Sequence, residues 1–171
     1  MDTRRIRRLS FGAITMIVVL LILHGLLAVA LLGAITHQAL SVLPTAAPAG
    51  DRWSFIDRFR GVDGTAYAMP IVVLFALTTL GGALIYPQYR IDVRPALEDM
   101  QNSAANGVFE IKEHLVAIGL GLLPAYWMFW QQPLAADTAA ARRYLTWLLA
   151  FFVWWSFIVG HLLNNIRGLL P

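Results

Sequence analysis

The residues of this chain best suited to chemistry are its histidines. There are four in 171 residues, His24, His37, His114 and His161, and each lies in or beside a long apolar run. An imidazole can bind a metal or haem iron and can exchange a proton near neutral pH. Because polar groups are costly at membrane depth, a histidine inside an apolar run is a candidate for function. The chain has no cysteine, which excludes disulfides, thiolate metal sites and thiol redox chemistry.

His114 and His161 form a candidate pair because they lie at a similar depth. At a helical rise of 1.5 Å per residue, His114 lies roughly 5–10 Å inside the cytoplasmic boundary of the third apolar run. His161 lies five residues before the end of the fourth run, at a similar distance from the same side. Two imidazoles at one level on neighbouring helices can supply both axial ligands of a b-type haem. Ala117 and Gly121, on the face of His114, leave room for a macrocycle, although small residues equally allow close helix packing.

We therefore predict one haem b, with His114 and His161 as its axial ligands near the cytoplasmic side. Three arginines at the same boundary can bind the propionates through charge-assisted hydrogen bonds: Arg90, Arg94 and Arg167. The alternative interpretation of His114 is a hydrogen-bonded histidine at the membrane surface. His161 can instead hold helices together at that boundary, as can the nearby Asn164 and Asn165.

The Glu110–His114 pair and His24 are two further candidate sites. Glu110 and His114 are four residues apart and share a helix face. A carboxylate beside a histidine can relay a proton, bind a metal or hydrogen-bond a quinone. The alternative is that Glu110, Lys112 and Glu113 form the hydrated first turn of their span. His24 lies deeper, roughly 20 Å from the cytoplasmic end by the helical rise. We predict that it hydrogen-bonds a neighbouring helix or relays protons, whereas His37 lies at the outer surface.

The segment from His161 to Gly168 resembles the membrane cytochrome b subunit of succinate dehydrogenase. That family has a haem-ligating histidine followed by a Gly-Ile-Arg-His run, and this chain has Asn165, Ile166, Arg167 and Gly168 at the corresponding places. The resemblance implies that His161 is a haem ligand and that Arg167 lies near haem propionates or a quinone.

The elements that would position these residues are membrane helices. Hydrophobic residues make up 58% of the chain and charged residues 13%, about half the charged share of a soluble domain. A bilayer core needs about 20 consecutive apolar residues, and four runs approach or exceed that length. We expect an all-α membrane protein whose single domain is an antiparallel bundle of four transmembrane helices, at residues 11–36, 67–86, 108–130 and 144–166.

The distribution of basic residues predicts the orientation. If the N-terminus is cytoplasmic, that side holds the larger share: Arg4, Arg5, Arg7, Arg8, Arg90, Arg94, Lys112 and Arg167 against Arg52, Arg58, Arg60, Arg142 and Arg143. We therefore expect both termini in the cytoplasm. The preference for arginine over lysine, with many Ala and Leu, is typical of GC-rich bacterial genomes, so we predict a bacterial inner-membrane protein. The outer loop, residues 38–65, should carry a short amphipathic helix around Trp53, Ile56 and Phe59. The cytoplasmic loop is expected at residues 87–107, with a helix first turn after Pro95.

Three classes of function fit this sequence. The first is a redox-linked membrane protein that binds one haem b or a quinone. The second is a non-catalytic subunit or assembly factor of a larger membrane complex or homo-oligomer, in keeping with the small extramembrane mass. The third is a component of a transporter or channel, although no inverted repeat is present. Nothing in the sequence indicates nucleic-acid binding, and whether the protein is an enzyme is undecided.

Overall fold

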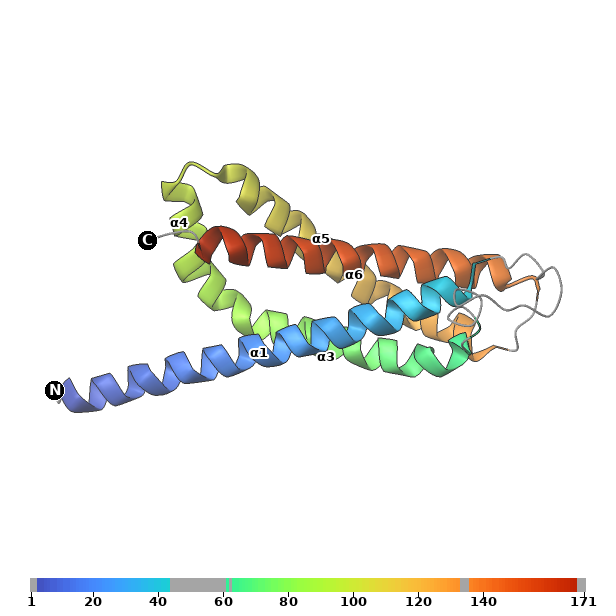
Figure 1. Ribbon diagram of the computed structural model, residues 1–171, viewed down its shortest axis with the longest axis horizontal. Coiled ribbons are helices and arrows are strands. Elements are labelled where there is room, and N and C mark those ends of the chain that lie inside the picture. Colours follow the sequence, from blue (N-terminus) through green and yellow to red (C-terminus); the bar gives the residue numbers. More distant parts are fainter. Residues whose placement is uncertain (1–2, 44–60, 62, 133–135, 169–171) are drawn as a thin grey trace.

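The chain forms long helices that lie side by side (Figure 1). The computed structural model describes residues 3–43, 61, 63–132 and 136–168, with the side chains of residues 3–14 and 166–168 left outside the description. Within these residues all regular structure is helical and there is no strand. The elements are α1 (Thr3–Ser41), the 3-10 helix η1 (Gly64–Tyr67), α3 (Ala68–Gln88), the π-helix η2 (Tyr89–Val93), α4 (Arg94–Asp99), α5 (Ser103–Gln131) and α6 (Ala139–Gly168).

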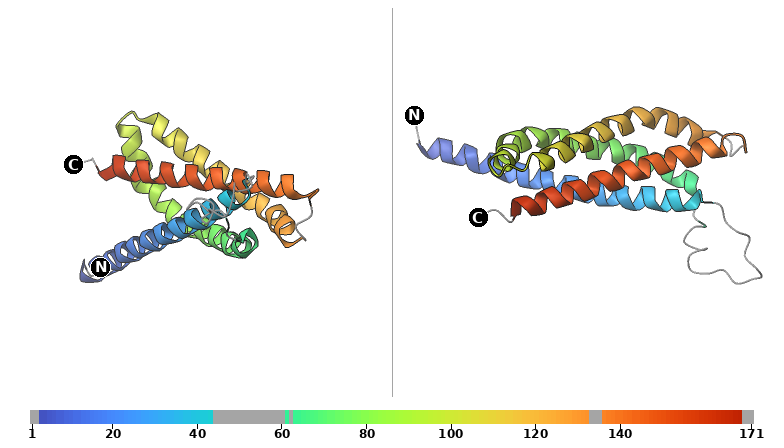
Figure 2. Two further views of the ribbon diagram at one scale, coloured as in Figure 1. Left: turned by 45° about the vertical axis from the view of Figure 1, so that its right-hand side comes forward. Right: turned by 90° about the horizontal axis from the view of Figure 1, so that it is seen from above.

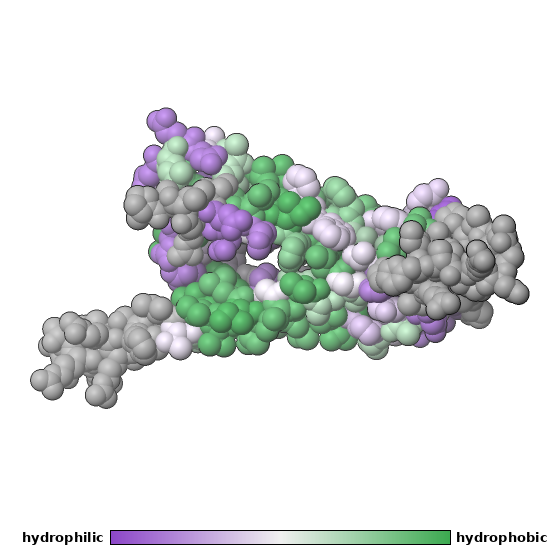
Figure 3. Space-filling model, viewed as in Figure 1, coloured by the Kyte–Doolittle hydropathy of each residue, from purple (hydrophilic) through white to green (hydrophobic). Residues whose placement is uncertain are grey.

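Three helical stretches are long and apolar enough to cross a membrane, by length and composition. They are Thr15–Ser41, Gly64–Asp99 and Ala139–Asn165. Their exposed surfaces are largely apolar, and in Figure 3 hydrophobic residues cover the middle of the molecule while hydrophilic ones gather toward its ends. The chain is therefore a helical membrane protein. The helix α5 does not belong to this set, because Glu110, Lys112 and Glu113 lower the hydropathy of its first half.

Local sequence signals mark the beginnings of several helices. Asn102 begins α5, where its side chain accepts a hydrogen bond from the backbone N–H of Ala105 at 3.2 Å. Asp63 begins η1 in the same way, accepting from the backbone N–H of Thr65 at 2.9 Å and from its hydroxyl at 2.6 Å. These hydrogen bonds hold the pKa of the Asp63 carboxyl below its usual range. Pro70 lies in the first turn of α3, where its missing N–H has no consequence.

The segment expected as a cytoplasmic loop, residues 87–107, is mostly helical. Pro87 cannot donate a backbone hydrogen bond, and the chain passes directly from α3 into the π-helix η2 and then into α4. The turn of helix expected around Pro95 is present, because α4 begins at Arg94 with the proline in its first turn. A tight turn at Gln101, with φ of 54°, then leads into α5. The amphipathic helix expected around Trp53, Ile56 and Phe59 lies outside the described residues.

Buried apolar residues form two clusters of different extent. The larger draws on all four long helices: Leu31, Ile35, Ala39, Ala68, Ile71, Phe75, Leu123, Tyr126, Trp130, Leu149, Ala150, Phe152 and Val153. The smaller contains Leu97, Ala105, Val159 and Leu163, from α4, α5 and α6 alone. The first cluster joins the four helices, whereas α1 has no residue in the second. Figures 1 and 2 show the corresponding shape, with the N-terminal part of α1 diverging from the C-terminal part of α6.

Candidate functional site

The structure places His114 and His161 on the outer faces of their helices. His114 is exposed, and its Nδ1 lies 2.7 Å from the backbone carbonyl oxygen of Glu110, one turn earlier. It is nine residues from the buried Leu123, which is about half a turn around the helix. His161 is also exposed and stacks on Phe157, with ring centroids 6.0 Å apart. In the described part of the chain no hydrogen bond or ring contact joins the two histidines, so a haem between them gains no support from this geometry.

The arginines expected to bind propionates are engaged elsewhere or lie beyond the described side chains. Arg94 pairs with Glu98 at 2.8 Å and with Glu110 on α5 at 3.4 Å. Arg90 donates to the Tyr86 hydroxyl at 3.3 Å. Arg167 is in the last turn of α6, and its side chain lies outside the described residues. Asn164 and Asn165 are exposed at the same end of α6.

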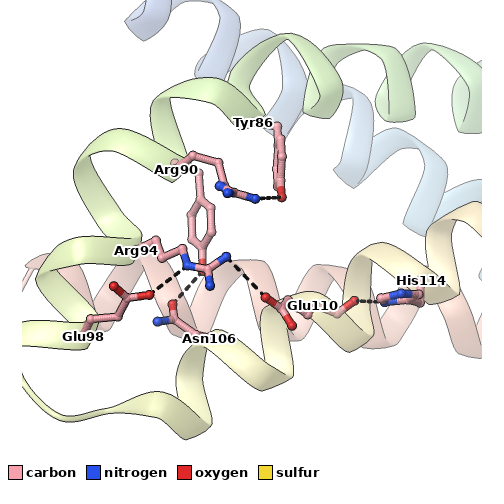
Figure 4. A network of polar contacts seen from close by, with 8 residues as sticks. Tyr86, Arg90, Arg94, Glu98, Asn106, Glu110 and His114 are labelled. Carbon is pink, nitrogen blue, oxygen red and sulfur yellow. Dashed lines mark hydrogen bonds and ion pairs between the residues drawn. The ribbon is translucent and has the colours of Figure 1, made fainter.

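These contacts belong to a larger rim network that connects the end of α3, η2 and α4 with the start of α5 (Figure 4). It contains Tyr86, Tyr89, Arg90, Arg94, Glu98, Asn106 and Glu110. The Tyr89 hydroxyl donates to the Asn106 side chain at 3.0 Å. The Tyr89 ring stacks on Phe109 with centroids 3.7 Å apart. The rim network therefore holds α5 against the end of α3, using charged groups that are in part exposed.

Deeper in the bundle, His24 is held against α3 by two glycines. A Cβ atom at Gly81 would lie 3.3 Å from His24 Nδ1, and one at Gly82 would lie 3.3 Å from His24 Cε1. His24 is seven residues before the buried Leu31, within about 20° of the same helix face, so it points into the bundle. The Gly81–Gly82 pair thus allows a close approach of α1 and α3 with an imidazole between them.

The only lysine of the chain lies near this histidine. Lys112 pairs with Glu113 at 2.9 Å, and its ammonium lies 4.7 Å from the centre of the Phe109 ring. The Lys112 side chain is 16% exposed and the Glu113 side chain 42%. Both charges act electrostatically on His24, and the Thr78 backbone lies beside the same ring. The hydrated first turn expected from the sequence fits Glu113 better than Lys112, whose side chain is mostly covered.

An aromatic layer separates this region from the rest of the bundle. Phe75 and Phe152 meet over Gly119, where a Cβ atom would lie 2.6 Å from Phe75 Cζ and 3.3 Å from Phe152 Cδ2. Lys112 is seven residues before Gly119, which places it on the same face about 10 Å toward the rim. Gly81 is six residues beyond Phe75, at about the same level. We call this level the polar layer: His24, Thr78, Lys112, Glu113 and Ser156.

Several buried polar atoms in and beside the polar layer have no hydrogen-bond partner among the described residues. They are His24 Nδ1, Thr78 Oγ1, Ser156 Oγ and the neighbouring Trp155 Nε1. An unsatisfied buried donor or acceptor costs about 1–3 kcal/mol. A protein keeps such groups at membrane depth where they meet water or a ligand. The polar layer therefore has the chemistry of a binding site, with donors, acceptors and one ion pair.

The opposite end of the bundle has several buried polar side chains that hydrogen-bond one another, and the sequence pattern did not predict these bonds. The Tyr126 hydroxyl donates to Gln38 Oε1 at 2.6 Å, and Gln38 Nε2 donates to the backbone carbonyl of Gly64 at 2.9 Å. Both side chains are fully buried. The Trp130 indole donates to Thr146 at 3.1 Å. Gln38 was expected at the start of an outer loop, but α1 continues past it, so that its side chain joins α1, η1 and α5.

The chain matches no family model, no curated protein and no solved structure. The resemblance of residues 161–168 to the succinate dehydrogenase subunit therefore stays a prediction. The contacts and burial described above are what support a site in the polar layer.

Proposed function

We propose that the chain is an integral membrane protein with four antiparallel spans, α5 being the fourth, and that it binds the headgroup of a quinone in the polar layer. The case for α5 as a span is its packing. Leu123, Tyr126 and Trp130 belong to the same buried cluster as residues of the three apolar helices. The 29 residues of α5 extend about 44 Å, which exceeds the roughly 30 Å of a bilayer core.

The orientation of the proposal follows the basic residues. Both ends of the chain lie at the same end of the molecule in Figure 1. The positive-inside rule places that end in the cytoplasm, and the composition favours a bacterial inner membrane. In this orientation the rim network lies at the cytoplasmic boundary and the polar layer lies between that boundary and the aromatic layer.

The observation that carries the quinone proposal is the half-buried His24 ring, whose buried Nδ1 has no hydrogen-bond partner among the described residues, with the Thr78 backbone next to it and the Lys112–Glu113 pair within electrostatic reach. A quinone ring presents carbonyl acceptors, and its reduced form presents hydroxyl donors. His24, Thr78 and Lys112 can donate to the carbonyls, and Glu113 can accept from a hydroxyl. The site has no net formal charge when His24 is neutral, which suits an uncharged headgroup arriving from the bilayer.

A binding measurement in lipid nanodiscs tests this proposal. The probe is a tailless dimethoxy-methyl-benzoquinone, followed by quenching of tryptophan fluorescence. We expect saturable binding to the wild type. The substitution His24→Leu should weaken it about tenfold, which corresponds to the loss of roughly 1.4 kcal/mol from a hydrogen bond.

The matched control is His161→Leu, which removes an exposed histidine outside the polar layer and should leave the affinity unchanged. Thr78→Val is a second variant of nearly unchanged shape, which guards against a fold defect in His24→Leu. Equal affinity for all four proteins, or no saturable binding to the wild type, would refute the proposal.

A haem held by His114 and His161 is the alternative, and one observation favours His114 as a ligand. When the ring nitrogen of a histidine donates to a backbone carbonyl, as His114 Nδ1 can to Glu110, the other nitrogen is directed outward as a lone pair. The visible spectrum of the purified protein tests this. A Soret band that disappears in both His114→Ala and His161→Ala would establish the haem, and the lack of such a band after incubation with haemin would exclude it.

A further inference from the structure

The two sides of the aromatic layer differ in how α1 meets α6. On the side away from the polar layer the two helices touch, since Ile35 and Ala39 of α1 share a buried cluster with Ala150 and Val153 of α6. On the polar-layer side, none of the α1 side chains described before Leu31, those of residues 15–30, is fully buried, and His24 itself is half-buried. Figures 1 and 2 agree that α1 and α6 diverge there. The polar layer is therefore open toward the bilayer on the α1–α6 side.

An apolar groove lies between the same two helices where they touch. It has a volume of about 250 Å³ and is lined by Thr36, Ala39, Leu40, Trp147, Ala150, Phe151 and Trp154. Two of its side-chain hydrogen-bonding groups, those of Thr36 and Trp154, are paired with the protein. Trp154 Nε1 donates to the Thr36 hydroxyl at 3.0 Å, and that hydroxyl donates to the Leu32 carbonyl at 2.6 Å.

The apolar lining and the paired Thr36 and Trp154 groups determine which kind of ligand the groove can hold. Thr36 and Trp154 are satisfied and the exposed lining is almost entirely apolar, with the Trp147 indole as the one further polar group, so the groove favours an apolar occupant. Exposed aromatic faces of Trp147, Phe151 and Trp154 form one wall, and they provide a large apolar contact area. A flexible hydrocarbon chain fits this description, whereas a headgroup does not.

We propose that the groove holds the isoprenoid tail of the quinone whose headgroup lies in the polar layer, so that the natural ligand is a long-chain quinone. This inference rests on the proposed function. The tail leaves the polar layer through the opening between α1 and α6 and follows α1 to the groove. From His24 to Thr36 is twelve residues, about 18 Å along the helix, and Leu40 is about 6 Å further. A tail shorter than about 18 Å does not reach the groove.

The groove can be filled without touching the polar layer. Leu40 is a half-buried lining residue, and Leu40→Trp adds an indole to the groove. The matched control is Leu148→Trp on α6, which adds the same side chain at an exposed position outside the lining. Both variants leave His24 and Lys112 unchanged.

The experiment uses the whole protein in nanodiscs and two probes at equal mole fraction in the lipid. One probe is the tailless benzoquinone, and the other carries the same ring with a tail of eight isoprene units and a photoreactive diazirine on the tail at about 18–24 Å from the ring, the distance from His24 to the groove. We expect the long-tailed probe to bind the wild type at least tenfold more tightly. Leu40→Trp should abolish this preference and leave the tailless affinity unchanged, while Leu148→Trp should change neither.

Photolabelling keeps the inference testable if Leu40→Trp fails to fold. In the wild type the diazirine should label peptides that contain residues 36–40 and 147–154. Label spread evenly over all lipid-facing helices would overturn the inference, as would a long-tail preference that survives in folded Leu40→Trp. In either case tailless binding that still depends on His24 would leave the proposed function intact, whereas no binding of either probe would overturn both.

Discussion

The two halves of this bundle differ in whether the buried polar groups described above have hydrogen-bond partners. In the closed half, on the Gln38–Tyr126 side of the aromatic layer, every buried polar side chain described above has a partner and four helices share one apolar cluster. In the open half, on the His24–Lys112 side, polar atoms are unpartnered and α1 leaves the cluster. Satisfied groups contribute stability, and unsatisfied ones provide binding capacity at a cost in stability. The contrast suits a closed half that contributes more of the stability and an open half that holds the binding site we propose.

The largest expected effect comes from overpacking the aromatic layer, where Phe75 and Phe152 meet over Gly119 between the two halves of the bundle. Gly119→Leu places side-chain atoms where a Cβ alone would already lie 2.6 Å from Phe75. We expect a destabilisation of about 3 kcal/mol or more, since overpacked cores lose roughly 1–3 kcal/mol and here the contact includes the Cβ itself. The measurement is thermal unfolding in detergent. The control Gly121→Leu, where a Cβ meets nothing within 4 Å, should leave the midpoint nearly unchanged.

The next effect tests the closed half by itself. Tyr126→Phe removes the hydroxyl that donates to Gln38 and leaves the buried Oε1 without this donor. We expect a loss of about 1–3 kcal/mol in the free energy of unfolding. Tyr144→Phe, at a residue 68% exposed, is the matched control and should cost little. If both variants unfold alike, the closed half is not the source of stability that we infer.

A pair of threonines compares the two halves directly. Thr146→Val removes a hydroxyl bonded to Trp130 and to the Arg142 carbonyl, and should cost about 1–2 kcal/mol. Thr78→Val removes a buried hydroxyl that lacks a partner, so it should leave stability unchanged or raise it by up to about 1 kcal/mol. Quinone affinity should move in the opposite sense, falling in Thr78→Val alone. Chemical denaturation and the nanodisc binding assay together decide the point.

The smallest effect concerns the rim network. Arg94→Gln breaks the ion pairs with Glu98 and Glu110, whose side chains are 55% and 56% exposed. Exposed pairs contribute little, so the loss should be the smallest of the series and should shrink as salt is raised. A loss as large as that of Tyr126→Phe that is insensitive to salt would mean that the rim network stabilises the open half more than its exposure indicates.

The sequence predicted the helices well and the pairing of their side chains poorly. Apolar runs place all four long helices to within a few residues at most ends, because burial in lipid needs only composition and length. Lipid-facing and core-facing positions are both apolar, so the runs do not reveal which face of α5 or α6 points inward. For that reason His114 and His161 could be matched in depth but not in direction.

Other features had a weak signal in the sequence, which indicated a type of contact but not the residues that make it. Gly81 and Gly82 next to each other in an apolar run indicate close approach, and His24 was recognised as a buried polar group, but nothing local connects residues 57 positions apart. Gln38 and Tyr126 are 88 residues apart, and their hydrogen bond exists only once α1 and α5 are placed together. The sequence also predicts a loop where the π-helix Tyr89–Val93 follows Pro87, because a proline more often ends a regular helix than changes it into a π-helix.

The sequence by itself determined that this chain is helical, apolar and poor in charge, and that its few polar residues in the apolar runs need an explanation. Those properties follow from composition and from spacing along one helix. Only the tertiary structure decided which polar residues meet, that His24 rather than His114 points into the bundle, and that one half is closed and the other open. The physical reason is that the position of a residue along a helix follows from the fixed rise per residue. The direction in which its side chain points, and the side chains that it meets, depend on how separate helices pack.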